Sequence, residues 1–174
     1  MNARICRGYG ATAAITSLTF GPKHATLVRM NFLRRRAGHR ESDVWTLAQG
    51  VIAGRRVLVR SKAVEPDRTR PVKVTIKIGL AEPDPNGWPG PADLDLLAAA
   101  EEILMAELAE HGAELVLVVT ANHAREFIAY SSSHEWLEQW GPSVLSRWSD
   151  DRPGTGVDAV MEPDWATYRV FASR

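Results

Sequence analysis

The clearest pattern along the chain is the strict alternation of apolar and polar side chains over residues 72–80. The even-numbered positions hold only valine, isoleucine and leucine, whereas Lys73, Thr75 and Lys77 take odd-numbered positions. Because successive side chains of a strand point to opposite faces, this segment is predicted to be a strand with one buried and one exposed face. Residues 115–119 are apolar throughout, which is typical of a strand buried on both faces.

Further strands and helices are predicted on either side of these two. The predicted strands are 44–48 and 55–60, which form a hairpin, 125–130, which returns antiparallel to 114–120, and 157–162. One helix is predicted from Pro91 to about His111. A second follows the capping box of Ser132 and Glu135 and is expected to break or kink at Gly141-Pro142. Asp164 is expected to cap a short final helix that carries Trp165.

From residue 72 onward the predicted order is strand–helix–strand–strand–helix–strand. This order predicts an α+β fold, a ferredoxin-like βαββαβ sandwich extended by the N-terminal β-hairpin. In that topology strand 114–120 lies at an edge, yet it is too apolar for an exposed edge. Either the N-terminal hairpin covers it, or a homodimer forms through this apolar edge strand.

Charge divides the chain into two parts. The chain has 21 basic and 21 acidic residues, but residues 1–80 hold 16 of the basic and 4 of the acidic ones. Residues 1–40 carry 8 basic side chains and no acid, which predicts a disordered basic arm, and Met30 within it is an alternative start. Residues 41–174 are predicted to be a single acidic domain. Nucleic acid is therefore an unexpected partner, since phosphate binding favours basic domains.

Composition and motifs argue against several kinds of chemistry. Cys6 is the single cysteine, so no internal disulfide or cysteine zinc site is expected, and the protein suits a reducing cytoplasm. The five histidines are dispersed and no phosphate-binding glycine motif follows a strand, so we expect neither a metal nor a cofactor. No apolar run reaches the ~20 residues of a membrane helix. Glu101 and Glu102 are expected to be solvated charges.

The polar faces of the predicted strands suggest a binding surface. Four cations, Arg56, Arg60, Lys73 and Lys77, are predicted to form one basic stripe on an open sheet face. Such a stripe would attract an anion or an acidic protein segment, although the same side chains could only keep the face soluble. Trp88 stands in a stiff Pro/Gly-rich loop, where it could anchor an interface.

Several segments resemble the bacterial domain of unknown function 695. They are VLVR (57–60), RPVKVTIKI (70–78), NGWP (86–89), AAAEEIL (98–104), VVTANHAREFIAY (118–130) and EPDWATYRVF (162–171). The resemblance spans residues 43–172 and implies no established reaction. It also implies a fold distantly similar to the B-type regulator of ribonuclease E activity, an acidic, non-enzymatic inhibitor.

These observations lead to one main expectation and two alternatives. The main expectation is a non-catalytic cytoplasmic binding or regulatory module for a protein or an anionic ligand. The candidate binding residues are Arg56, Arg60, Lys73, Lys77, Trp88, Thr120, Arg125, Glu126, Tyr130, Asp164 and Trp165. The first alternative is a small hydrolase or transferase that uses Glu126 or His123 as its base at the end of the 120–130 hairpin. The second is RNA binding on the open basic sheet face, which needs exposed aromatic side chains there.

Overall fold

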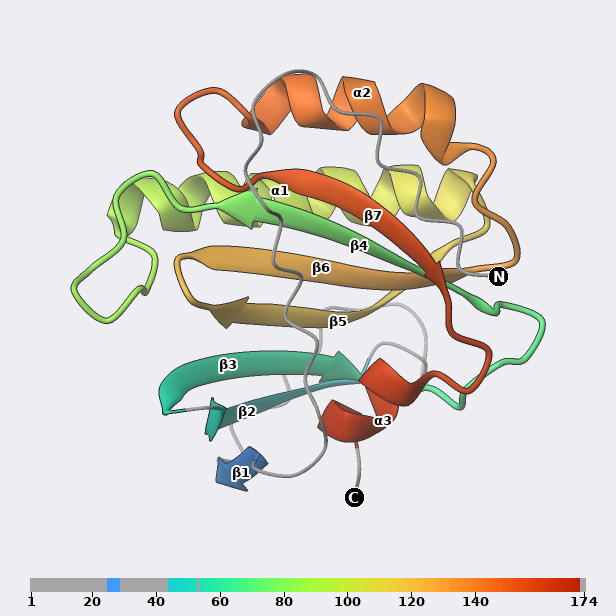
Figure 1. Ribbon diagram of the computed structural model, residues 1–174, viewed down its shortest axis with the longest axis horizontal. Helices are drawn as coiled ribbons and strands as arrows, with labels where there is room; N and C mark the ends of the chain where they lie inside the picture. The colour runs from blue at the N-terminus through green and yellow to red at the C-terminus, as the bar shows by residue number, and fades with distance from the viewer. Residues whose placement is uncertain (1–24, 29–43, 53, 173–174) are drawn as a thin grey trace.

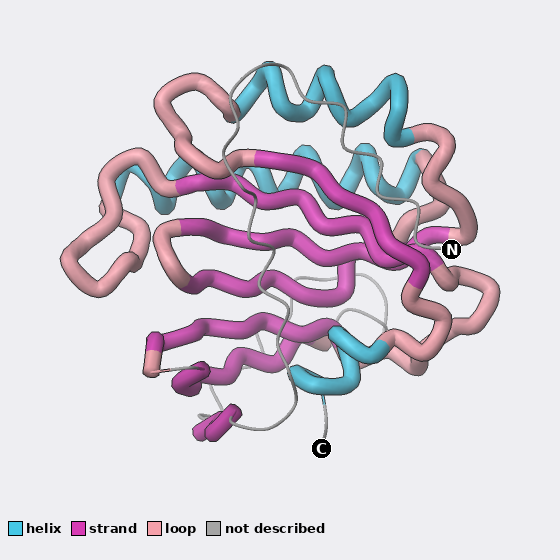
Figure 2. Tube along the Cα trace, viewed as in Figure 1, coloured by secondary structure: helices cyan, strands magenta, loops and turns pink. Residues whose placement is uncertain are grey.

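The computed structural model describes residues 25–28, 44–52 and 54–172, and these residues form an α+β fold, as predicted (Figure 1). The elements in chain order are β1 (Ala25–Val28), β2 (Trp45–Ile52), β3 (Arg55–Lys62), β4 (Val72–Gly79), α1 (Pro91–Glu110), β5 (Glu114–Ala121), β6 (Ala124–Ser131), α2 (Leu137–Trp148), β7 (Gly156–Met161) and α3 (Ala166–Ala172). In Figure 2 the strands lie beside one another, α1 and α2 run along one part of the sheet, and α3 lies apart from them.

The described strands form one sheet of seven, in the order β1-β2-β3-β5-β6-β4-β7, and every neighbouring pair is antiparallel. Strand β5 lies inside this sheet, because β3 pairs with its free side through Val59 opposite Val119. The N-terminal hairpin therefore covers the apolar strand, and the predicted dimer through an apolar edge strand loses its basis.

Four residues of the segment predicted to be a disordered arm belong to the sheet. Ala25–Val28 form β1, which pairs antiparallel with β2, with Val28 opposite Gln49. This pairing corrects the prediction for those four residues. The rest of residues 1–40 lies outside the described residues.

The first core layer lies between the sheet and the two long helices. The predicted apolar stripe of β4 is confirmed: Val74, Ile76 and Ile78 are fully buried in this layer. The main helical contribution is the α1 stripe of Leu97, Leu104 and Leu108, completed by Trp140, Val144 and Trp148 of α2. The burial of these apolar side chains is the main source of stability for a domain of this length.

A second core layer lies on the opposite face of the sheet, under α3. Trp165 is 1% exposed and stacks on Tyr130, with ring centroids 3.9 Å apart and 7° between the planes. Val57 and Val59 of β3 belong to the same layer. The sheet therefore carries helices on both faces, which corrects the expectation of one open face.

Two predicted helix ends differ from the structure. Helix α2 begins at Leu137 and continues through Pro142 to Trp148, so the Ser132 capping box does not start it and the Gly-Pro pair does not end it. A proline six residues into a helix removes only one backbone bond near the first turn, which the packing of Trp140 and Val144 offsets. Among the described residues, the Asp164 side chain accepts no backbone N–H of α3, and Glu162 accepts the backbone N–H of Thr167 instead.

Candidate functional site

Strand β3 carries a row of cations on the face that looks toward α1. Its residues alternate, so that Arg56, Leu58, Arg60 and Lys62 share this face, while Val57 and Val59 point to the α3 side. Arg60 lies opposite Val118 of the α1 layer. The row arises because every second side chain of a strand points to the same face, and the even-numbered positions of β3 are mostly basic.

The four cations of the predicted stripe do not share one face. Lys73 and Lys77 lie opposite Tyr130 and Glu126, and Tyr130 belongs to the α3-side core. Arg56 and Arg60 lie on the α1 side. The prediction of a single stripe is therefore wrong, because alternation within one strand does not fix which face of another strand of the sheet lines up with it.

Arg60 is held by a carboxylate of α1. Its Nη1 donates to both carboxylate oxygens of Glu101, at 2.7 and 2.8 Å, and its guanidinium carbon lies 5.1 Å from the centre of the Trp45 ring. The Glu101 side chain is only 11% exposed, against 38% for Arg60. Ring and carboxylate together fix the position of the Arg60 guanidinium, whose other nitrogens have no acceptor among the described residues.

Arg125 lies beside this pair on the same face. Its Nε donates to Thr120 Oγ1 at 2.9 Å, and both terminal nitrogens lack an acceptor among the residues that the structure describes. Burial lowers the pKa of the Arg125 guanidinium, Glu101 raises it, and the Arg60 charge lowers it again. Arginine nevertheless stays protonated. Glu101 therefore bonds to one guanidinium and acts electrostatically on a second one in a partly buried place.

This arrangement can bind an anion. A planar guanidinium with two free N–H-bearing nitrogens matches the geometry of a carboxylate or phosphate, and both bonds are charge-assisted. We call Arg60, Thr120 and Arg125, with Trp45 and Glu101, the arginine site. The structure thus brings together three of the predicted residues and adds two that the sequence analysis missed.

A signal for Glu101 was present in the sequence. Helix α1 places Leu97, Leu104 and Leu108 on its core stripe, and Glu101 lies four residues after the first of these. A carboxylate at such a position needs a cation, which the expectation of a solvated charge overlooked. Trp45, in contrast, gave no separate signal, because its role depends on the β2–β3 register.

The predicted residues Tyr130, Lys73 and Trp165 anchor α3 to the sheet. The Tyr130 hydroxyl donates to Glu162, and Lys73 Nζ donates to Glu162 Oε1 at 3.3 Å and to Thr167 Oγ1 at 2.9 Å. Trp165 Nε1 donates to the backbone oxygens of Asp67 and Arg70. Every one of these polar groups is satisfied within the chain, as expected for a structural network.

Ionisation fits this structural role. Burial raises the pKa of Tyr130, and so does the adjacent Glu162 carboxylate. Burial alone would also raise the pKa of Glu162, but hydrogen bonds from Tyr130 and Thr167 and the Lys73 charge outweigh it, so the pKa is lowered. The network therefore holds a neutral tyrosine against an ionised glutamate.

Glu126 of β6 and Lys77 of β4 lie directly opposite each other but do not form an ion pair. Burial raises the pKa of the Glu126 carboxyl, and the charges of Lys77 and Lys73 only partly oppose it. His123, the other predicted base, is exposed at the β5–β6 turn, where its φ is 63°. A groove of about 490 Å³, lined partly by Ser61, Glu65 and Tyr168, contains none of the predicted site residues.

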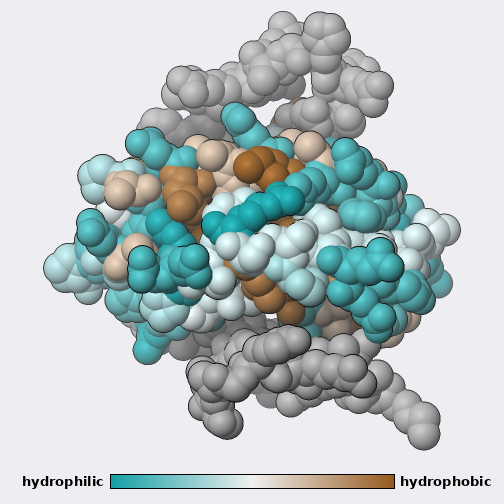
Figure 3. Space-filling model, turned by 90° about the horizontal axis from the view of Figure 1, so that it is seen from above, coloured by the Kyte–Doolittle hydropathy of each residue, from teal (hydrophilic) through white to brown (hydrophobic). Residues whose placement is uncertain are grey.

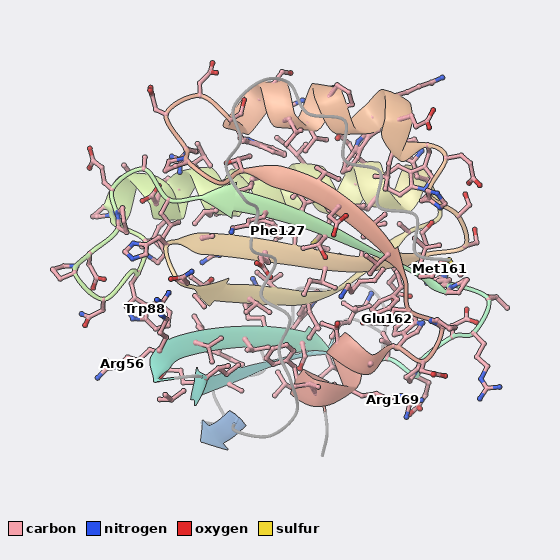
Figure 4. All side chains as sticks on the ribbon, viewed as in Figure 1. Arg56, Trp88, Phe127, Met161, Glu162 and Arg169 are labelled. Carbon is pink, nitrogen blue, oxygen red and sulfur yellow. The ribbon has the colours of Figure 1, made fainter. Side chains whose placement is uncertain are left out.

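Trp88 and Arg56 lie at the same end of the sheet, where the β2–β3 and β5–β6 hairpins turn (Figure 4). The loop that carries Trp88 is rigid, since Asp84 Oδ1 accepts the backbone N–H groups of Asn86 and Trp88, both at 2.8 Å. Trp88 is half-buried and Arg56 is exposed. Neither belongs to the arginine site.

The described part of the chain contains neither a cluster of metal-ligating side chains nor a membrane-spanning helix. Within it, no three His, Cys, Asp or Glu side chains form a group suited to a metal ion. None of its helices has the length and apolarity needed to cross a membrane.

Comparison with known proteins gives a family and nothing closer. No curated protein and no solved structure matches the chain. The model of one family, described as a family of unknown function (DUF695), matches residues 44–172. This match covers both core layers and the arginine site, and the chain therefore belongs to the DUF695 family.

Proposed function

We propose that this protein is a non-catalytic binding module that recognises an anionic group at the arginine site. The observation that carries the proposal is the state of Arg125: a half-buried guanidinium whose terminal nitrogens have no acceptor among the described residues. Leaving charged donors unpaired in a desolvated place costs free energy, and a bound carboxylate or phosphate would recover it.

Binding is better supported than catalysis. The alternative hydrolase or transferase needs a base with a shifted pKa inside a cleft that can hold a substrate. Glu126 has the raised pKa, but it does not line the groove beside α3, and His123 is exposed at a turn. Glu126 is therefore better explained as a carboxylate that the fold has partly buried.

RNA binding receives less support. The described part of the β4–β6–β7 face offers Lys73 and Lys77, but Glu126 and Asp158 stand among them. Tyr130, the aromatic side chain on this face of β6, is fully buried under Trp165. A single-stranded RNA would have no stacking platform there.

We also propose a specific fold topology and a cellular compartment for this protein. The order β5-β6-β4-β7, with α1 and α2 in one layer, supports a ferredoxin-like unit to which β1–β3 are added. The single cysteine supports a reducing compartment such as the bacterial cytoplasm.

Titration of the full chain with two anions, inorganic phosphate and a hexaglutamate peptide, tests the proposed function. Arg60 lies against Trp45, so tryptophan fluorescence should report binding near the site. Arg125→Gln should weaken binding of whichever anion binds by about ten- to a hundredfold, the usual loss for a charged hydrogen bond. Arg68→Gln is the matched control, since Arg68 is an exposed loop arginine. Failure of both anions to bind at millimolar concentration, or equal loss in the two variants, would overturn the proposal.

A further inference from the structure

The solvent side of α1 is unusually apolar for an exposed helix. Its large exposed side chains are Leu94, Ile103 and Met105, at 49%, 40% and 42% exposure, and five further exposed positions are alanines. The helix holds six acidic residues and no lysine, arginine or histidine. A helix that is apolar on its outer side as well as its core side is normally covered.

The neighbouring face of β2 and β3 has the opposite charge. Strand β3 holds four basic residues and no acidic one, and Arg56 and Arg60 point to the α1 side. Residues directly opposite each other share a face, so Leu47 of β2 accompanies Arg60 and the 44% exposed Val51 accompanies Arg56. This face, which we call the β2–β3 face, therefore mixes cations with apolar side chains.

The acidic helix and the β2–β3 face are contiguous. Glu101 of α1 contacts Arg60 of β3, and helical periodicity puts Leu94 and Met105 on the same side of α1 as Glu101. Apolar side chains of α1 thus border the basic face. Seen from above in Figure 3, apolar patches interrupt the hydrophilic surface on the helix side of the molecule.

We propose that a second copy of this chain covers this surface, with α1 of each copy lying on the β2–β3 face of the other. A two-fold axis makes the same patch meet itself, so a patch with an acidic apolar half beside a basic apolar half is self-complementary. The proposal rests on the proposed function, because it names the anionic groups that the arginine site receives as carboxylates of the second copy's α1. Charge complementarity favours this occupant over a nucleic acid, which the acidic helix would repel.

Charge reversal on each half of the patch tests the proposal. Arg56 and Glu102 are both exposed, so Arg56→Glu and Glu102→Lys should leave the fold intact, which circular dichroism can verify. Each variant should weaken self-association of the full chain in sedimentation equilibrium by about tenfold or more, because each places like charges in both copies of the contact. Matched controls are Arg68→Glu in a loop and Glu138→Lys on α2.

Mixing the two variants is the sharper test. When one chain carries Arg56→Glu and the other carries Glu102→Lys, one of the two contacts keeps the native charges and the other has them exchanged. The two single variants should therefore form a heterodimer as tight as the wild-type dimer. A micromolar dissociation constant is ordinary for a dimer. A wild-type chain that stays monomeric at about 100 times that concentration would overturn the proposed dimer. So would a dimer that resists both reversals, or reversals that the mixture does not rescue.

The outcome separates this inference from the proposed function. A monomeric chain that still binds phosphate or hexaglutamate through Arg125 would overturn the second copy as occupant and keep the anion site. A dimer that forms through this surface while Arg125→Gln changes neither assembly nor anion binding would keep the dimer and overturn the site.

Discussion

A single nitrogen of Arg60 donates to both carboxylate oxygens of Glu101, and this bond joins the β2–β3 hairpin to the long helix α1. The same carboxylate acts electrostatically on Arg125. Glu101 therefore both fixes one arginine of the site and lowers the attraction of the site for an outside anion. Each of these two effects leads to a measurable prediction.

Replacing Glu101 with glutamine should strengthen anion binding and weaken the fold. The substitution frees Arg60 and removes the carboxylate that competes with the ligand, so the affinity for phosphate or hexaglutamate should rise. The free energy of unfolding should fall by about 1–3 kcal/mol, because a charged hydrogen bond of a mostly buried group is lost. Fluorescence titration and urea unfolding measure the two effects. Glu138→Gln, at an exposed position of α2, serves as the control and should change both by little.

Ile76→Ala should destabilise the protein by about 2–5 kcal/mol, since Ile76 is fully buried between the sheet and both long helices and the substitution leaves a cavity. Val160→Ala, at a position of β7 that is 38% exposed, is the comparison and should cost less than about 1 kcal/mol. Denaturant unfolding of both variants measures the difference. Similar losses at the two positions would contradict the assignment of the core.

Asp93 should make the protein sensitive to acid. Its side chain is 1% exposed and bonds to Arg152 at 2.5 Å and to the backbone N–H groups of Ala81 and Glu82. Burial alone would raise the pKa of this carboxyl, but the bonds from Arg152 and the backbone outweigh it and the pKa is lowered. A carboxyl with a lowered pKa in the folded state stabilises the fold above its unfolded pKa, near 3.9, and loses that contribution as the pH falls through the folded value.

Urea unfolding of wild type and Asp93→Asn from pH 7 down to pH 3 measures this contribution. The variant should be less stable at pH 7, and the difference should shrink as the pH drops below about 4. A difference that stays constant over this range would show that the charge of Asp93 adds nothing to stability.

The contribution of Glu126 to folding stability should depend on pH in the opposite direction to that of Asp93. Burial raises the pKa of its carboxyl, so the charged form is disfavoured in the folded state, and the stability that this group contributes at low pH is lost as the pH rises through the folded pKa. Glu126→Gln should therefore stabilise the protein at pH 7 and have little effect near pH 3. Thermal unfolding at the two pH values measures it. Destabilisation at pH 7 would mean that the pairing with Lys77 outweighs burial.

Only part of the candidate site could be predicted from the sequence. Thr120 and Arg125 could be selected from the sequence, because a hairpin of 114–130 places them opposite each other, as observed. The sequence also places Arg60 on a strand, but it wrongly predicts a shared stripe with Lys73 and Lys77. The relative phase of two strands depends on which strand lies between them, and β5 and β6 separate β3 from β4 in the sheet.

Patterns that lie within one element were determined by the sequence itself. The alternation around Ile76 defines a buried strand face, and the run from Pro91 to Gly112 defines α1, because strand and helix periods act on neighbouring residues. Only the tertiary structure decided that α3 covers the second sheet face and that Glu101 meets Arg60. Those contacts join residues 38 positions or more apart, and their free energy depends on burial and charge that no local pattern records.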